Sequence, residues 1–387
     1  MSQSQSWMKP SAHVVILTLM GLVCSLLYLA NTTNKTPTIS PRQLIRLIAN
    51  KNVFLINVHT SYVGEIEHTD TFINPASLEV TSKLLPQNLD QPIIVYDQDD
   101  SVAPRATQAL LNMGFSNVRY LSGGMRAWQK NGNKLLDLSM LEATVLPKEG
   151  IELPILWGTL GKQLVDIGVI DLDAFQKAVP LTTEQKQILT HGSTERIKIT
   201  TQNSQFVVDV LWALGLAQKS KVFTDGPMGK EEKDEVRNLA STGGWNLARG
   251  LAIDYLNAYE LIPLTESQQD QVADIAHHVY RPCCNNSVWF PDCNHGMAAL
   301  AIIELLVSQH VDESTIYKKL LGFNSFWFPD SYLTIAAYFA RMGVPWSLVD
   351  AKEVLGFPYS SGTGAQKISS IVGPLPFTTN FIGGCGV

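Results

Sequence analysis

The chain is 387 residues long but contains no cysteine between Cys24 and Cys283. Five cysteines in a chain of this length exclude a small disulfide-stapled protein. The stretch without cysteine leaves the first globular part of the chain without a thiol nucleophile. The chain also lacks an excess of positive charge, because 29 Lys and Arg residues face 35 Asp and Glu residues, for a formal net charge of -6. This balance gives no electrostatic basis for nucleic-acid binding, and we predict none.

Several common functional motifs are missing from the sequence. It has no Walker-type phosphate loop, no G-x-G-x-x-G fingerprint and no Ser-His-Asp order. It also has neither the C-x-x-C spacing of zinc fingers nor the C-x-x-C-H of attached haem. With 45% apolar and 17% charged residues the chain is not broadly disordered, and its length predicts two or three domains.

Near the N-terminus, residues 13–30 contain no Asp, Glu, Lys or Arg. As a helix these residues would extend about 27 Å, close to the hydrocarbon thickness of a bilayer. We therefore predict an N-terminal tail (1–12) and a single transmembrane anchor (13–30) that binds the membrane, with the bulk of the chain on the exported side. A cleaved signal peptide and a buried helix are the alternatives.

Residues 38–137 alternate short apolar runs with helical patterns. The apolar runs have the composition of strands buried on both faces of a parallel sheet. Ser40 and Gln43 form a capping box, and Pro41 suits the first helical position. The predicted strands are 53–58, 92–97 and 118–121, and the predicted helices are 41–50, 101–113 and 125–132. This order predicts an α/β domain with a parallel sheet and flanking helices.

The last part of this region, GFSNVRYLSGGMRAW at 114–128, resembles the rhodanese-like family, as do the preceding LINV and IIVYD runs. The resemblance implies a reactive Cys after the central strand, held as a thiolate in a cradle of backbone N–H groups and able to carry a persulfide. Here Asp97 occupies that position. A carboxylate cannot form a persulfide, so we predict no catalytic residue and a recognition domain that is an inactive sulfurtransferase homologue.

Two further acids, Asp99 and Asp100, follow Asp97 in the same loop. We interpret the three carboxylates as a solvated loop with a helix cap. The alternative is a cation site, since clustered carboxylate oxygens suit Ca²⁺ or Mg²⁺.

The remainder of the chain has the pattern of helices. We predict a linker at 138–155, a helical domain at 156–367 without strands, and a flexible tail at 368–387. One of the predicted helices covers 248–262, and another is opened by the capping box of Thr265 and Gln268.

The chemically informative segment of this domain joins two predicted helices. It brings together thiols and imidazoles, which are ligands of Zn²⁺, Cu⁺ and iron–sulfur centres. A structural disulfide between Cys283 or Cys284 and Cys293, a reactive thiol and plain buried cysteines are the alternatives. The candidate metal ligands are Cys283, Cys284, Cys293, His295, His277 and His278.

Three functions are compatible with these features. The first is an anchored binding protein with an inactive rhodanese-like domain, a protein partner and a Cys/His site for Zn or Cu. The second is a thiol, sulfur or metal redox enzyme that uses Cys283, Cys284 or Cys293. The third is a disulfide-stabilised docking module without a metal ion.

Overall fold

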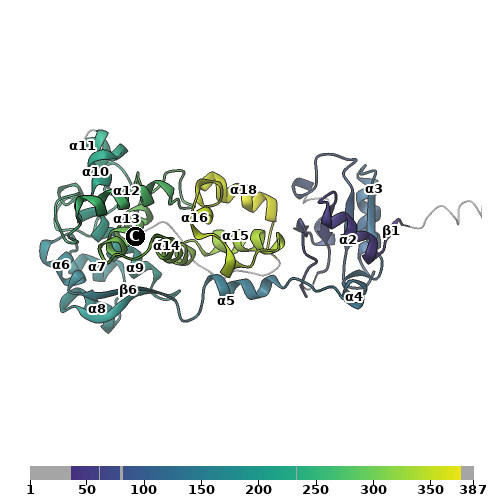
Figure 1. Ribbon diagram of the computed structural model, residues 1–387, viewed down its shortest axis with the longest axis horizontal. Coiled ribbons are helices and arrows are strands. Elements are labelled where there is room, and N and C mark those ends of the chain that lie inside the picture. Colours follow the sequence, from purple (N-terminus) through teal and green to yellow (C-terminus); the bar gives the residue numbers. More distant parts are fainter. Residues whose placement is uncertain (1–35, 61, 79–81, 232, 376–387) are drawn as a thin grey trace, which may run out of the picture. The chain divides into compact units, whose positions relative to one another are not determined.

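The computed structural model describes residues 36–375 except 61, 79–81 and 232 (Figure 1). The described chain divides into two compact units. The first comprises residues 36–59, 74–78 and 86–133, and the second comprises residues 60–73, 82–85 and 134–375. Segment 60–73 therefore interrupts the first unit in sequence and folds with the second.

A parallel sheet forms the centre of the first unit, with the strand order β1-β5-β4-β2. The central strand β4 is buried at every residue, which explains its unbroken apolar run. The elements are β1 (Thr38–Ile39), α2 (Pro41–Ala49), β2 (Phe54–Asn57), the 3-10 turn η1 (Pro75–Ser77), β4 (Ile93–Tyr96), α3 (Ala103–Asn112), β5 (Val118–Leu121) and α4 (Gly124–Lys130). The predicted α/β domain with a parallel sheet is confirmed.

Local sequence signals explain where two helices of this unit begin. The Ser40 N–H donates to Gln43 Oε1 at 3.0 Å, as the capping box requires, and Pro41 is the first residue of α2. Gly123 precedes α4 with a φ of 73°, a left-handed conformation that glycine adopts without steric cost.

The second unit is mostly helical, as predicted. Its larger helices are α6 (Leu160–Ile167), α8 (Thr183–Thr190), α9 (Ser204–Ala217), α12 (Glu266–His278), α13 (Asn294–Ser308), α14 (Glu313–Trp327), α15 (Pro329–Arg341) and α18 (Gly362–Val372). Its short elements are β3 (Thr71–Phe72), α5 (Leu141–Val145), α7 (Leu172–Ala178), α10 (Lys221–Asp225), α11 (Lys233–Arg237), α16 (Ala351–Val354), α17 (Phe357–Ser360) and the 3-10 turns η2 (Ser82–Leu84), η3 (Leu138–Met140), η4 (Pro227–Lys230), η5 (Ala252–Asp254) and η6 (Trp346–Leu348).

The expectation that this unit contains no strand is wrong. Strands β6 (Ile151–Gly158) and β7 (Ser193–Ile199) pair antiparallel, with Ile151 opposite Ile199. Proline inside β6 and the mostly exposed, polar residues of β7 hide the two-residue period that marks a strand. Part of the predicted linker 138–155 is therefore ordered as η3, α5 and the start of β6.

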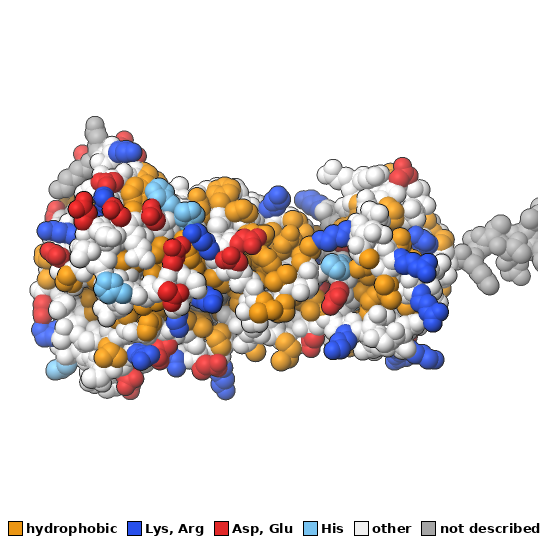
Figure 2. Space-filling model, in the orientation of Figure 1, with side chains coloured by type: hydrophobic (Ala, Val, Ile, Leu, Met, Phe, Trp, Pro, Cys, Tyr) orange, Lys and Arg blue, Asp and Glu red, His pale blue; other side chains and the backbone are white. Residues whose placement is uncertain are grey.

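Helices α9 and α13 pack against each other in the core of the second unit, with α12 and α14 beside α13 (Figure 1). Both helices are buried over almost their whole length, as their apolar sequences require. A Cβ atom at Gly215 would lie 2.1 Å from the Met297 carbonyl oxygen, so only glycine permits this close approach. On the face shown in Figure 2, basic and acidic side chains intermingle over this unit.

Two boundaries predicted for the helical half need correction. Within the predicted helix 248–262 only η5 is helical; the rest of the segment is turn and irregular structure, stabilised by contacts such as the Tyr259 N–H to the Ala217 carbonyl. The predicted tail begins too early, because α18 continues to Val372 and buries Ile368 and Val372. Residues 376–387, including Cys385, lie outside the described residues.

The localisation prediction is also corrected. Within residues 36–375, apart from the gaps given above, no helix is both long enough and apolar enough to cross a bilayer. This finding contradicts the prediction of a single-pass membrane protein. The segment predicted to span, 13–30, lies outside the described residues, as does Cys24.

A buried ion pair fixes segment 60–73 within the second unit. Arg341 of α15 donates from Nε to Glu65 Oε1 at 2.8 Å, and both side chains are at most 5% exposed. The same guanidinium donates to the carbonyl oxygens of Asp70 and Val372. Burial raises the pKa of the Glu65 carboxyl and outweighs the opposing effect of Arg341.

Candidate functional site

The candidate site is the loop that joins α12 to α13 in the second unit. The loop is held at several points, since the Val288 N–H donates to the Val279 carbonyl, the Trp289 N–H to the Ala276 carbonyl, and the Gly362 N–H to the Cys284 carbonyl at 2.7 Å. These bonds place the loop against both α12 and the start of α18. The three loop cysteines are therefore presented by an ordered backbone.

Cys283 and Cys293 lie together in this loop. Their sulfur atoms are 3.5 Å apart, with Cys283 exposed and Cys293 partly buried. Cys293 is the N-cap of α13, and its sulfur accepts the Gly296 N–H at 3.4 Å. The helix N-terminus thus directs a backbone donor at this sulfur, which favours its thiolate form.

Arg281 supplies the positive charge of the site. Its side chain is 1% exposed, and its Nε donates to Cys293 Sγ at 3.1 Å. Nη2 donates to Asp292 Oδ1 at 2.6 Å, and the remaining donors reach the carbonyl oxygens of Asn286 and Phe290. A buried guanidinium with a carboxylate and a sulfur as partners is an electrostatic anchor for the whole loop.

Neighbouring hydrogen bonds and charges shift the pKa values of Cys293 and Cys284 in opposite directions. Hydrogen bonds from Cys283 and Cys284 hold the pKa of Cys293 well below its usual value, and the charge of Arg281 adds to this effect. For Cys284, a hydrogen bond with Cys283 lowers the pKa, but a hydrogen bond with Cys293 and burial outweigh it and raise the pKa to about 11. The surroundings therefore favour the thiolate form more strongly at Cys293 than at Cys284.

His295 lies in the first turn of α13 and faces the aromatic core. It is 4% exposed and packs against Phe328 and Trp327, with ring centroids 4.4 Å and 5.7 Å from its own. Its Nδ1 is buried without a hydrogen-bond partner among the described residues. An unsatisfied buried ring nitrogen is costly, and coordination of a metal ion would satisfy a nitrogen of this kind.

The structure brings together only some of the predicted ligands. Single ligand atoms of Cys283, Cys293 and His295 all lie within 4.8 Å of one another, and so do those of Cys284, Asp292 and Cys293. His277 and His278 join neither group. His277 stacks on Trp289 at 4.3 Å, and His278 is exposed with its Nδ1 near the Asp274 carbonyl.

Asp292 and Arg281 are the parts of the site that sequence reasoning missed. Asp292 is already engaged, because Oδ1 accepts from Arg281 and Oδ2 accepts from Asn286 Nδ2 at 2.7 Å. A Cβ at Gly296 would lie 2.7 Å from Arg281 Nη2, so this glycine makes room for the guanidinium. The available signal was an arginine two residues before a cysteine pair, with an acid beside the third cysteine.

The Asp97 loop of the first unit has a different construction. Asp97 is fully buried, and its carboxylate accepts the N–H groups of Asp100 at 2.8 Å, Val102 at 2.5 Å and Ala103 at 3.1 Å. Asp100 in turn accepts the Gly123 N–H on both oxygens, and Asp99 pairs with Arg126 at 2.9 Å.

Hydrogen-bond donors and a guanidinium of the protein therefore bind all three carboxylates, which argues against the Ca²⁺ or Mg²⁺ alternative. The interpretation as a solvated loop is also wrong for Asp97, because its carboxylate is buried. Its role as a cap fits, since it accepts the N–H groups at the start of α3.

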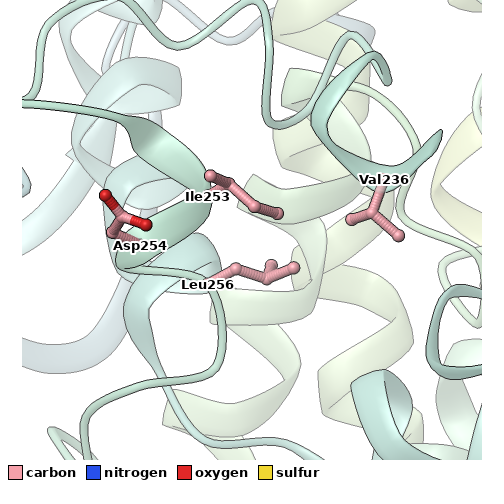
Figure 3. Close-up of a pocket in the computed structure, with 4 residues that line it drawn as sticks. All are labelled: Val236, Ile253, Asp254 and Leu256. Carbon is pink, nitrogen blue, oxygen red and sulfur yellow. The ribbon is translucent and has the colours of Figure 1, made fainter. Parts of the chain in front are cut away.

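A surface hollow of about 380 Å³ also occurs in the second unit, lined by Val236, Ile253, Asp254 and Leu256 (Figure 3). The three aliphatic side chains point toward one another, whereas the Asp254 carboxylate points away from them. None of these four side chains directs a polar group toward the other three, so they supply no orienting contact of the kind typical of ligand sites.

Comparison with known families decides the identity of the first unit. The family model of the rhodanese-like domain matches residues 40–131. Residues 40–131 form a rhodanese-like domain. The helical half of the chain has no family match, and comparison with curated proteins found no match to the chain.

Solved structures resemble the same part of the chain. A rhodanese-related protein from Thermoplasma volcanium is 20% identical, covering 26% of this chain and 97% of its own, with a TM-score of 0.23. A human single-domain sulfurtransferase is 22% identical, covering 25% and 97%, with a TM-score of 0.22. The SseA protein of Escherichia coli, a 3-mercaptopyruvate sulfotransferase, is 22% identical, covering 27% and 51%, with a TM-score of 0.24. Likenesses at this level carry no argument about this chain, and the assignment of the domain rests on the family model.

Proposed function

We propose that the protein binds a Zn²⁺ or Cu⁺ ion through Cys283, Cys293 and His295. The observation that carries the proposal is the proximity of three ligand atoms of suitable chemistry, all within 4.8 Å of one another. Two sulfurs bound at about 2.3 Å to a tetrahedral ion would be about 3.8 Å apart. The 3.5 Å between Cys283 and Cys293 is close to that separation.

The surroundings of the three residues support the same proposal. The Arg281 Nε–H bond to Cys293 is the kind of outer contact that orients a ligand and stabilises its charge. The buried Nδ1 of His295 lacks another partner among the described residues. Two thiolates and one imidazole favour Zn²⁺ or Cu⁺ over the oxygen-preferring cations. Three protein ligands leave one position of a tetrahedral ion for an external ligand.

Cys284 has no place in this ligand set. Its sulfur lies 3.8 Å from Asp292 Oδ1, and that carboxylate is held by the Arg281 guanidinium. A cation bound by Cys284, Asp292 and Cys293 would have to displace the Arg281 and Asn286 donors that already bind the two Asp292 oxygens. Cys284 therefore provides a matched control inside the same loop.

We further propose that the rhodanese-like domain does not transfer sulfur and acts as a recognition module for a protein partner. The support is that the sequence has no cysteine from 25 to 282 and that Asp97 itself occupies a set of backbone N–H donors. The full chain should transfer no sulfur from thiosulfate to cyanide above the uncatalysed rate. A turnover that survives Cys283→Ser and Cys293→Ser substitutions would overturn this part of the proposal.

Metal analysis of the full chain tests the ion site. The protein, purified under reducing conditions and loaded with Zn²⁺, should hold one equivalent after desalting, and Cys293→Ser and His295→Ala should each lose it. Cys284→Ser and His278→Ala should retain it. Circular dichroism of each variant separates loss of the site from loss of the fold. Wild-type protein without bound zinc or copper, or equal loss in Cys284→Ser, would contradict the proposal.

A further inference from the structure

The sulfurs of Cys283 and Cys293 are close enough to form a disulfide after a small movement. Their sulfurs are 3.5 Å apart, and a movement of about 1.5 Å would bring them to the disulfide distance of about 2.05 Å. Cys283 and Cys284 are adjacent, so their Cα atoms are about 3.8 Å apart, below the usual range for a disulfide. Cys284 is also directed at the Asn286 carbonyl and the Asp292 carboxylate.

Cys283 and Cys293 differ in their exposure and in the donors that surround them. Cys283 is the exposed thiol, so a small oxidant in solvent reaches it first. Cys293 lies behind it and receives the Arg281 Nε–H and the Gly296 N–H, two donors that stabilise a sulfur anion at the helix N-terminus. An accessible sulfur with a stabilised sulfur anion in contact is the arrangement of a redox-sensitive pair.

We infer that Cys283 and Cys293 are a modification site that a peroxide converts into a disulfide, and that this conversion releases the bound ion. The inference rests on the proposed metal site, because the same two sulfurs serve as ligands. Once they are bonded to each other, neither is a thiolate, and only His295 of the three ligands remains. A single imidazole does not retain the ion against the solvent.

The chemistry balances with a peroxide as the oxidant. The Cys283 thiolate attacks one peroxide oxygen, the O–O bond breaks, and the leaving oxygen takes a proton to give water or an alcohol. Cys283 becomes a sulfenic acid. The Cys293 thiolate then attacks the Cys283 sulfur, the S–O bond breaks, and the departing hydroxide takes a proton to give water. Two thiolates have lost two electrons, and the peroxide has gained them.

A dithiol reductant reverses the change. One of its thiolates attacks the disulfide, and its second thiol closes its own disulfide and frees both protein sulfurs. The two ligands then become available for the ion again. The site would thus hold its ion under reducing conditions and lose it under peroxide.

The test uses the full chain loaded with Zn²⁺ and treated with one equivalent of hydrogen peroxide. We expect release of about one equivalent of zinc, measured with a chromogenic chelator, and the loss of two of the five thiols. Peptide mass mapping should find the link between Cys283 and Cys293. Dithiothreitol followed by fresh Zn²⁺ should restore the original metal content.

Two variants keep the inference falsifiable. Cys284→Ser should behave like the wild type, whereas Cys283→Ser should form no loop disulfide. A zinc-loaded protein in which peroxide produces no link between Cys283 and Cys293, or links Cys284 equally, overturns the inference and leaves the metal site standing. A reduced protein that holds no metal but forms this disulfide overturns the metal site and ion release, leaving a bare redox pair.

Discussion

Two loops of the molecule each place an acidic side chain, one carboxyl and one thiol, at the start of a helix, and they differ in what surrounds that side chain. In the rhodanese-like domain, the Asp97 carboxylate is buried and accepts three backbone N–H groups near the start of α3. In the helical unit, Cys293 caps α13 and receives one backbone N–H and one guanidinium N–H. Both follow the preference of helix N-termini for negative charge.

The difference concerns what remains available for chemistry. The Asp97 oxygens already accept N–H groups of the protein itself, so they are not available to a ligand. The Cys293 sulfur still faces another thiol at 3.5 Å and belongs to a group with His295. We conclude that helix-terminal stabilisation serves structure in the first loop and ligand chemistry in the second.

The largest effect is expected at Arg281. Arg281→Met removes the buried cation and leaves Asp292 and the Cys293 sulfur without their partner, so the free energy of unfolding should fall by about 3–5 kcal/mol. Urea denaturation of the zinc-free protein measures it. The same substitution at Arg196, whose pair with Glu152 is exposed, should cost less than about 0.5 kcal/mol. Equal costs at the two arginines would contradict the anchoring role of Arg281.

A slightly smaller effect is expected at Asp97. Asp97→Ala leaves three buried or partly buried N–H groups without this acceptor, which should destabilise the loop by about 3 kcal/mol. The Val102 and Ala103 amides should then exchange with deuterium at least about tenfold faster than in the wild type. Unchanged exchange at these amides would show that the carboxylate does not close the loop.

Asp209 on α9 tests how much the free energy of unfolding falls when a buried carboxyl has few hydrogen-bond donors. Among the residues that the structure describes, the Gln205 amide alone donates to its carboxyl, and burial raises its pKa to about 7. Above about pH 4 the unfolded chain ionises this carboxyl while the folded protein keeps the proton, so the free energy of unfolding falls as pH rises towards 7.

Because of this carboxyl, wild-type stability should fall by about 2 kcal/mol more between pH 5 and pH 8 than that of Asp209→Asn. Urea denaturation at the two pH values compares the proteins. An identical pH dependence in both would mean that Asp209 is stabilised by donors, as Asp97 is.

The smallest effect is expected at Asp99, two residues from Asp97. Its partner Arg126 is 65% exposed, so Asp99→Asn should cost about 0.3 kcal/mol. Amide exchange in the loop should stay within twofold of the wild type. A cost comparable to that of Asp97→Ala would indicate that the acidic cluster acts as a unit.

The sequence predicted the rhodanese-like domain because its signals are local. The apolar strands, the capping box at Ser40 and the turn at Gly123 are each readable within a few residues. The β6–β7 pair was missed because its residues are 35 or more positions apart and its pattern is half polar. The fold of segment 60–73 with the second unit was missed because it depends on Glu65 meeting Arg341, 276 residues later.

The candidate site, like the fold, could be predicted from the sequence only in part. The cysteines and His295 were recognised because their side chains carry metal-binding chemistry at short spacing. Arg281 was not, because a charged residue beside a loop is usually solvated, and its burial arises only where the loop folds over it. His277 and His278 were included for proximity along the chain, but helix geometry directs one to Trp289 and the other to solvent.

X-ray absorption at the zinc edge of the loaded full chain tests the central claim most directly, because it counts the atoms around the ion. We predict two sulfurs at about 2.3 Å and one imidazole nitrogen at about 2.0 Å, with both sulfurs retained in Cys284→Ser. A shell of oxygen and nitrogen alone, or one that loses a sulfur in Cys284→Ser, would contradict the proposed site.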